Sequence, residues 1–139
     1  MKQVTEKLWI APQPKAADFE EMKEKGITRI INNRTDGEDP GQPTAAESAT
    51  TATELGLSYV HIPVVPGEVT TEKVRAFQKA LAEAAGPVLA HCKTGTRSLT
   101  LWAIGEVLDG RMTAAEIDGL GNRMGVDLAG ARNWLKANN

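Results

Sequence analysis

The chain is poor in cysteine and histidine, and this shortage excludes several kinds of site. Its 139 residues include one cysteine, Cys92, and two histidines, His61 and His91. A single cysteine excludes an intrachain disulfide framework and a cysteine-rich zinc site, because both need several thiols. Two histidines could not complete a zinc shell without several carboxylates. We therefore predict neither a metal nor another cofactor.

Aromatic residues, excess charge and long apolar runs are also scarce. The chain has three tryptophans, one tyrosine and two phenylalanines, and its net charge is −2. A nucleic-acid binder would need a basic surface and more rings for base stacking. No apolar run reaches the roughly 18 residues of a membrane span, and the N-terminal segment lacks the apolar core of a signal peptide. We expect a cytoplasmic protein with no nucleic-acid or membrane partner.

What remains is the composition of an ordinary globular domain. Hydrophobic residues make up 41% of the chain and charged residues 24%. A chain of this length buries roughly 68–70% of its unfolded surface, which is enough for a core without disulfides or metals. The length predicts a single catalytic domain over residues 1–139.

Short apolar runs alternate with amphipathic stretches. Strands are predicted at 8–11, 27–31, 57–62 and 88–90, where apolar or β-branched residues cluster. Helices are predicted at 15–25, 44–55, 71–85, 98–109 and 127–137, with a further one beginning at the capping box Thr113–Glu116. This alternation predicts an α/β fold with three layers, in which helices flank a mostly parallel central sheet.

The stretch from His91 to Ser98 carries the most chemical information. Cys92 stands at the carboxyl end of a predicted parallel strand, and a tight polar loop of Lys93, Thr94, Gly95 and Thr96 leads to Arg97 and a helix. Ligands bind at this edge of open α/β sheets. The loop N–H groups can form a nest for an anion, and the helix N-terminus adds partial positive charge. Gly95 permits a backbone angle that larger residues resist.

These neighbours predict that Cys92 is a nucleophile, although a lone cysteine at a strand end can also be a packed core residue. A thiol beside a helix N-terminus and an arginine ionises more readily than a free thiol. Arg97 offers a planar fork for a tetrahedral oxyanion, and Ser98 can donate its hydroxyl to the thiolate or to a leaving sulfur. His91 is expected to orient the loop through backbone carbonyls, and His61 to be structural.

The spacing of this loop resembles two related enzyme loops. Cysteine-dependent phosphatases use His-Cys-x5-Arg-Ser/Thr, whereas rhodanese-like sulfurtransferases often use Cys-x-x-Gly-x-Arg. Four residues separate Cys92 from Arg97, as in the sulfurtransferase loop, while the leading His91 matches the phosphatase signature.

Motifs along most of the chain resemble one family. They are Ile31-Asn-Asn-Arg34-x-Asp36-Gly37-Glu38, Gln42-Pro43, Tyr59-Val-His-Ile-Pro63-Val and Leu89-Ala-His-Cys-x-x-Gly-Thr-Arg-Ser. Together they resemble the beta-lactamase hydrolase-like, phosphatase-like domain family, from about Leu8 to about Leu108. The resemblance implies the fold of the dual-specificity cysteine phosphatases.

The chain departs from the phosphatase pattern at the general acid. Dual-specificity phosphatases place an aspartate shortly after an Ile-Pro-Val-like strand end, but here Val65 stands near that place. Glu68 could substitute if its loop folds inward, and Asp36 is the second candidate. Arg34 could bind an anionic substrate group or pair with Asp36 or Glu38 to order the loop at 32–42.

The short loop and the absent aspartate favour sulfur transfer as the main hypothesis. Cys92 would take sulfur from thiosulfate or a persulfide and pass it, as a persulfide, to an acceptor thiol or protein. The alternative is hydrolysis of a phosphate ester through a phosphocysteine, and a third reading is an anion-binding module without chemistry. With one cysteine in the chain, the acceptor in either reaction must be water or a group from outside.

Overall fold

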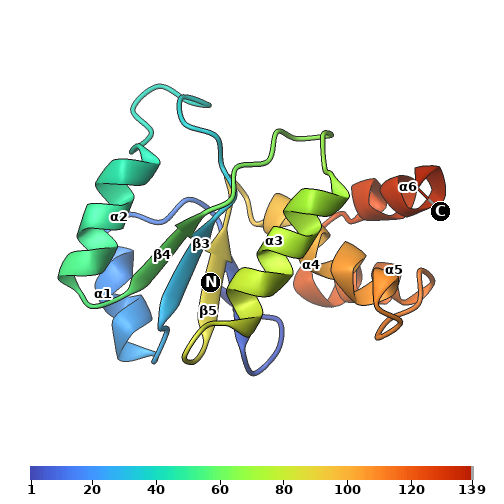
Figure 1. Ribbon diagram of the computed structural model, residues 1–139, viewed down its shortest axis with the longest axis horizontal. Coiled ribbons are helices and arrows are strands. Elements are labelled where there is room, and N and C mark those ends of the chain that lie inside the picture. The colour runs from blue at the N-terminus through green and yellow to red at the C-terminus, as the bar shows by residue number, and fades with distance from the viewer. Residues whose placement is uncertain (139) are drawn as a thin grey trace.

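The computed structural model describes residues 1–138 and has a five-stranded sheet at its centre (Figure 1). The strand order is β1-β2-β5-β3-β4. The strands are β1 (Lys2–Gln3), β2 (Leu8–Ala11), β3 (Arg29–Asn32), β4 (Ser58–His61) and β5 (Val88–His91). β1 pairs antiparallel with β2, and every other pairing is parallel. The predicted mostly parallel sheet is confirmed.

Helices cover both faces of this sheet, as the sequence predicts. They are α1 (Ala16–Glu24), α2 (Ala45–Glu54), α3 (Thr71–Ala82), α4 (Thr96–Leu108), α5 (Glu116–Met124) and α6 (Ala129–Ala137). α1 and α2 lie on one face, and α3 to α6 lie on the other (Figure 1). The three-layer α/β architecture is therefore confirmed.

The alternation of side chains along β5 shows how the sheet separates two cores. Val88 and Ala90 face the larger core beneath α3 and α4, whereas Leu89 faces the smaller core beneath α1 and α2. All three side chains are fully buried. A strand buried on both faces reads as a continuous apolar run, which is the pattern of this segment.

Most boundaries differ from the sequence prediction by one to three residues, and three further differences concern β1, β5 and α5. β1 was not predicted, because two exposed residues carry no apolar pattern. β5 extends through His91, which pairs in register with Asn32 and Ala11. The Thr113–Glu116 capping bonds form, but the intervening residues make a turn and α5 begins at Glu116.

The register of β3 against β5 sets the position of the site. Asn32 pairs with His91, so the chain leaves both strands at the same edge of the sheet. The loop after β3 and the loop after β5 consequently lie side by side at the carboxyl edge. Within residues 1–138, no helix is long and apolar enough to cross a membrane.

Candidate functional site

Cys92 is the first residue after β5, and its side chain lies at the base of the loop that leads into α4. It is buried, with a relative exposure of 1%. The Gly95 N–H donates to its Sγ at 3.0 Å. Gly95 has φ +98°, in the left-handed region that glycine tolerates best. The predicted special backbone angle at Gly95 is confirmed, and it turns a peptide N–H toward the sulfur.

Other N–H groups of the same loop are available to an anion. Those of Lys93, Thr94, Thr96 and Arg97 make no hydrogen bond within residues 1–138. Thr96 and Arg97 begin α4, a helix of 13 residues, so the positive end of its dipole adds to theirs. The arrangement stabilises negative charge on the sulfur and on a tetrahedral anion in front of it.

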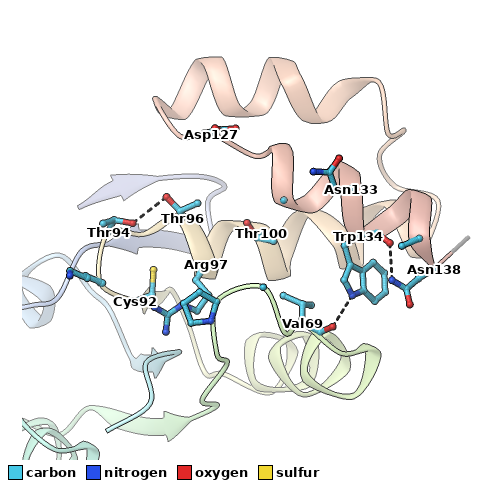
Figure 2. A pocket seen from close by; sticks show the side chains of 15 residues that line it. Val69, Cys92, Thr94, Thr96, Arg97, Thr100, Asp127, Asn133, Trp134 and Asn138 are labelled. Atoms are coloured by element: carbon cyan, nitrogen blue, oxygen red, sulfur yellow. Dashed lines mark hydrogen bonds between the residues drawn. The ribbon is translucent and has the colours of Figure 1, made fainter. Parts of the chain in front are cut away.

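The loop forms one end of a pocket of about 750 Å³ (Figure 2). From this loop the pocket is lined by Cys92, Lys93, Thr94, Thr96 and Arg97. The other walls come from the segment after β4, from α4, and from α6 with the residues on either side of it. These lining residues are Pro66, Gly67, Val69, Thr100, Asp127, Gly130, Asn133, Trp134, Ala137 and Asn138.

Arg97 lines this pocket and is held from behind by an ion pair. Its Nη1 donates to Glu38 Oε2 at 2.7 Å, and its Nη2 donates to Glu38 Oε1 at 3.2 Å. Nη1 also donates to the carbonyl oxygens of Asn33 at 3.1 Å and Val64 at 3.0 Å. Nε has no partner within residues 1–138. The Nε–Nη2 edge of the guanidinium therefore keeps donors for a second bidentate contact.

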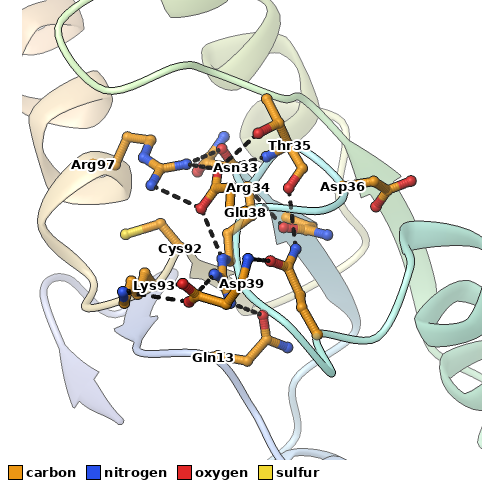
Figure 3. Close-up of polar contacts among 12 residues, drawn as sticks. Gln13, Asn33, Arg34, Thr35, Asp36, Glu38, Asp39, Cys92, Lys93 and Arg97 are labelled. Atoms are coloured by element: carbon orange, nitrogen blue, oxygen red, sulfur yellow. Dashed lines mark hydrogen bonds and ion pairs between the residues drawn. The ribbon is translucent and has the colours of Figure 1, made fainter.

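Glu38 joins two arginines and is the centre of a buried charge network (Figure 3). It accepts from Arg34 Nε at 2.9 Å and from both the N–H and the hydroxyl of Thr35. Burial opposes ionisation of Glu38, but the hydrogen bonds from Arg97, Arg34 and Thr35 outweigh it and hold the pKa well below its usual range. Glu38 is thus a fixed anion and not a proton donor at neutral pH.

The same network reaches the Cys92 loop at a second point. Arg34 Nη2 donates to Asp39 at 2.7 Å, and Asp39 also pairs with Lys93 at 3.3 Å. Arg34 Nη1 donates to Gln13 Oε1 at 3.0 Å, and the Gln13 N–H donates to the Lys93 carbonyl. Of the two roles predicted for Arg34, the structure shows the ordering role. Its side chain is buried and lies outside the pocket lining.

Ser98 does not contact the sulfur, which corrects the predicted hydroxyl donation. Its Oγ donates to Asn33 Oδ1 at 2.7 Å, and both residues are fully buried. Asn33 Nδ2 donates in turn to the Ile62 carbonyl. The hydroxyl is committed to this link because a buried amide oxygen left without a donor would be costly. Ser98 therefore joins α4 to the end of β3.

The two histidines are structural groups next to the site. His91 is buried with its Nδ1 3.4 Å from the Cys92 carbonyl oxygen, which agrees with the predicted contact to the loop backbone. Burial is the main cause that lowers the pKa of His91 to about 4, so the ring is neutral. His91 does not line the pocket. His61 Nε2 lies 2.6 Å from the Arg34 carbonyl oxygen, as expected of a satisfied structural histidine.

Neither residue predicted as an acid lies in the pocket. Asp36 points away from the charge network, and its Oδ1 accepts from the Ala45 N–H at the start of α2 (Figure 3). Glu68 is exposed and is absent from the pocket lining, although its neighbours Pro66, Gly67 and Val69 line the pocket. The lining residue with a carboxyl group is Asp127, which accepts the Ala129 N–H at 2.9 Å.

Sequence reasoning missed three residues that shape the site. Asn33 links β3 to α4, Glu38 holds Arg97, and Trp134 forms the far wall of the pocket. Glu38 was expected only as a partner of Arg34. Its contact with Arg97 joins residues 59 positions apart, and no local pattern reports such a contact. Within residues 1–138, no group of three His, Cys, Asp or Glu is placed to hold a metal ion.

Comparison with curated proteins finds relatives along nearly the whole chain. A beta-lactamase hydrolase-like protein of Agrobacterium fabrum is 47% identical over 133 residues. This match covers 96% of the chain and 31% of the relative. The chain thus spans about a third of the length of that longer protein.

Solved structures with the same fold include phosphatases. A candidate phosphatase from Neisseria meningitidis superimposes with a TM-score of 0.88 at 33% identity, covering 99% of this chain and 97% of that one. Tk-PTP in its active form gives 0.73 at 17% identity, covering 98% and 93%. TpbA of P. aeruginosa in complex with phosphotyrosine gives 0.61 at 17% identity, covering 95% and 87%.

These superpositions confirm the cysteine-phosphatase fold. The family model described as "Beta-lactamase hydrolase-like protein, phosphatase-like domain" matches residues 1–109, which include the Cys92 loop and the Glu38 network. The chain belongs to this family of phosphatase-like domains.

Proposed function

We propose that the chain hydrolyses phosphate monoesters through a phosphocysteine at Cys92. One observation carries the proposal: Cys92 lies in the same pocket as Arg97, and its sulfur accepts the Gly95 N–H of the loop between them. The family and the phosphatase neighbours support it, as does the phosphotyrosine complex of TpbA. This reverses the order of the two reactions expected from the sequence, because none of these relatives points to sulfur transfer.

In the first step the Cys92 thiolate attacks phosphorus, a sulfur–phosphorus bond forms and the ester phosphorus–oxygen bond breaks. The Nε–Nη2 edge of Arg97 and the loop N–H groups hold the equatorial oxygens as charge redistributes. In the second step water attacks phosphorus, the sulfur–phosphorus bond breaks and the thiolate is restored. Glu38 keeps the guanidinium in place behind the site.

The arrangement of carboxyl groups predicts which esters react fastest. Glu38 is a fixed anion, while Asp36 and Glu68 lie outside the pocket lining. General acid catalysis is typically worth about 10²–10⁴-fold, and it matters most for poor leaving groups. We expect 4-nitrophenyl phosphate, which leaves as a stable phenolate, to react far faster than an alkyl phosphate.

The test is turnover of 4-nitrophenyl phosphate by the purified chain, with Cys92→Ser as the matched variant. We expect turnover by the natural chain and a loss of about 10⁴-fold or more in Cys92→Ser, because the nucleophile is removed. Glu68→Gln is the control and should keep full activity. Absence of turnover by the natural chain, or substantial turnover by Cys92→Ser, would refute the proposal.

Sulfur transfer is a second candidate because four residues separate Cys92 from Arg97. A loop of this length suits a small sulfur donor such as thiosulfate. Sulfite or a thiolate can leave without a proton, which also fits the missing aspartate near Val65. Thiosulfate with cyanide in the same assay, together with the intact mass of the fresh protein, separates the two. One extra sulfur on Cys92 would favour this candidate.

A cytoplasmic location and the single domain over residues 1–139 stay predictions.

A further inference from the structure

The pocket is much larger than its anion-binding end. Its volume of about 750 Å³ lies in the range of sites for whole organic ligands, roughly 300–1,000 Å³. Figure 2 shows Cys92 and Arg97 at one end and Trp134 at the other, with Thr100 between them. A phosphate bound at Cys92 leaves the rest of the pocket to the group that it esterifies.

The far wall is built around the indole of Trp134 in α6. The ring is half-buried, and its Nε1 donates to the Val69 carbonyl at 2.8 Å. This bond fixes the indole against the segment that follows β4, so the ring is already oriented before a ligand enters. Val69 lies beside the indole (Figure 2), and Ala137 also adds apolar surface to the pocket lining.

Charge is distributed unevenly along the pocket. Among the lining residues the cations are Lys93 and Arg97, and both belong to the Cys92 loop. Asn133 and Asn138 line the α6 wall without charge, and Asp127 adds a carboxylate just before α6, at the other end of this helix from Asn138. A second phosphate placed toward Trp134 would meet no lining cation, whereas an uncharged ring would meet the indole.

We propose that Trp134 is a specificity-determining residue that binds the aromatic leaving group of a monophosphate ester and disfavours esters with a second phosphate. The proposal rests on the proposed function and names its substrate class. The family model ends at residue 109, so α6 lies outside the segment that defines the family.

The kinetic test compares two phosphoryl donors whose leaving groups depart without a general acid: the aryl ester 4-nitrophenyl phosphate and the acyl phosphate acetyl phosphate. In Trp134→Ala we expect KM for the aromatic ester to rise about tenfold with kcat nearly kept, because the ring contact is lost. For acetyl phosphate, KM and kcat of Trp134→Ala should stay within about twofold of those of the natural chain. Trp134→Phe should keep KM for 4-nitrophenyl phosphate close to that of the natural chain, because the phenyl ring replaces most of the contact. Trp9→Phe, on a strand that packs against the other core, is the control.

A binding test judges the wall without turnover. In the Cys92→Ser protein we expect phenyl phosphate to bind about tenfold more tightly than inorganic phosphate, and Trp134→Ala to remove this advantage. 1,4-Phenylene bisphosphate should bind more weakly than phenyl phosphate, and Asn133→Lys should narrow that difference.

The outcomes separate the two proposals. If the natural chain hydrolyses neither 4-nitrophenyl phosphate nor acetyl phosphate, the proposed function fails, and the binding test alone decides the role of Trp134. The specificity proposal is wrong if Trp134→Ala lowers kcat/KM equally for 4-nitrophenyl phosphate and acetyl phosphate. It is also wrong if phenyl phosphate and inorganic phosphate bind with the same affinity when Trp134 is present. Tighter binding of the bisphosphate would overturn its second half.

Discussion

Two loops meet at the carboxyl edge of the sheet, and they build the site by different means. The loop after β5 acts through its backbone: the Gly95 N–H donates to the Cys92 sulfur, and neighbouring N–H groups make no hydrogen bond within residues 1–138. The loop after β3 acts through charged side chains, because Glu38 binds both Arg97 and Arg34. One loop supplies the reacting group, and the other holds its partner arginine.

The difference predicts different sensitivities. Backbone donors persist as long as the turn persists, and they tolerate changes in most side chains of the loop. A buried ion pair depends on every member, because loss of one leaves an uncompensated charge in a poor solvent. Single substitutions should therefore lower the free energy of unfolding most in the loop after β3, whereas the reaction itself depends most on Cys92.

The largest effect on stability is expected for Glu38→Gln. The amide keeps the shape of the side chain but removes the charge between buried Arg34 and partly buried Arg97, whose side chains are 3% and 10% exposed. Breaking such a pair typically costs about 3–5 kcal/mol, and we expect a loss of about 4 kcal/mol in the free energy of unfolding. Because Arg97 loses its support, kcat/KM for 4-nitrophenyl phosphate should fall about tenfold. Urea unfolding and steady-state kinetics measure the two effects.

Asp39→Asn is the matched control for this comparison. Asp39 also pairs with Arg34, but its side chain is 40% exposed and it does not contact Arg97. We expect a much smaller change in stability and kcat/KM close to that of the natural chain. Equal effects of the two substitutions would show that the loop works as a diffuse charged surface and not through Glu38.

The same contrast explains what the sequence could predict. Cys92, Gly95 and Arg97 lie within six consecutive positions between a strand and a helix, so local geometry alone indicates an anion site. The pair of Glu38 with Arg34 is local and was anticipated, but the pair of Glu38 with Arg97 joins residues that only the pairing of β3 with β5 brings together. Such contacts depend on tertiary register, which periodicity and spacing do not contain.

The pocket wall from α6 was beyond sequence reasoning for a similar reason. The apolar pattern of Trp134 and Leu135 predicts a packed helix, and α6 does pack on the larger core. Which face of the indole borders the pocket depends on how the chain returns after α5. The general acid differs from these cases, because the missing aspartate can be read directly from the sequence. The structure adds that Glu68 is exposed and lies outside the pocket lining.

The next effect is pH dependence, which should separate the two loops. The pKa of His91 is lowered mainly by burial to about 4, from about 6.5 in the unfolded chain. Between these values the unfolded chain binds a proton that the folded chain does not, so stability falls as pH decreases. The free energy of unfolding should drop by up to about 3 kcal/mol from pH 6.5 to 4. Denaturant unfolding at a series of pH values measures this drop.

Glu38 acts in a lower window. Its pKa is held below the usual range, so its contribution is fully present above about pH 4.5 and is lost only as pH falls further. His91→Gln should therefore flatten the profile between pH 6.5 and 4.5, while Glu38→Gln should leave that part of the slope unchanged. A slope that persists in His91→Gln would assign it to another group.

The smallest effect is expected at Ser98, where one neutral hydrogen bond joins α4 to the loop after β3. Ser98→Ala removes the 2.7 Å bond to Asn33 Oδ1 and leaves a buried acceptor without its donor. We expect a loss of about 1–2 kcal/mol in the free energy of unfolding, measured by urea unfolding. Because the hydroxyl does not contact the Cys92 sulfur, kcat for 4-nitrophenyl phosphate should stay within about threefold. A fall of about a hundredfold in kcat, with little change in stability, would instead mean that Ser98 turns to the sulfur during the reaction.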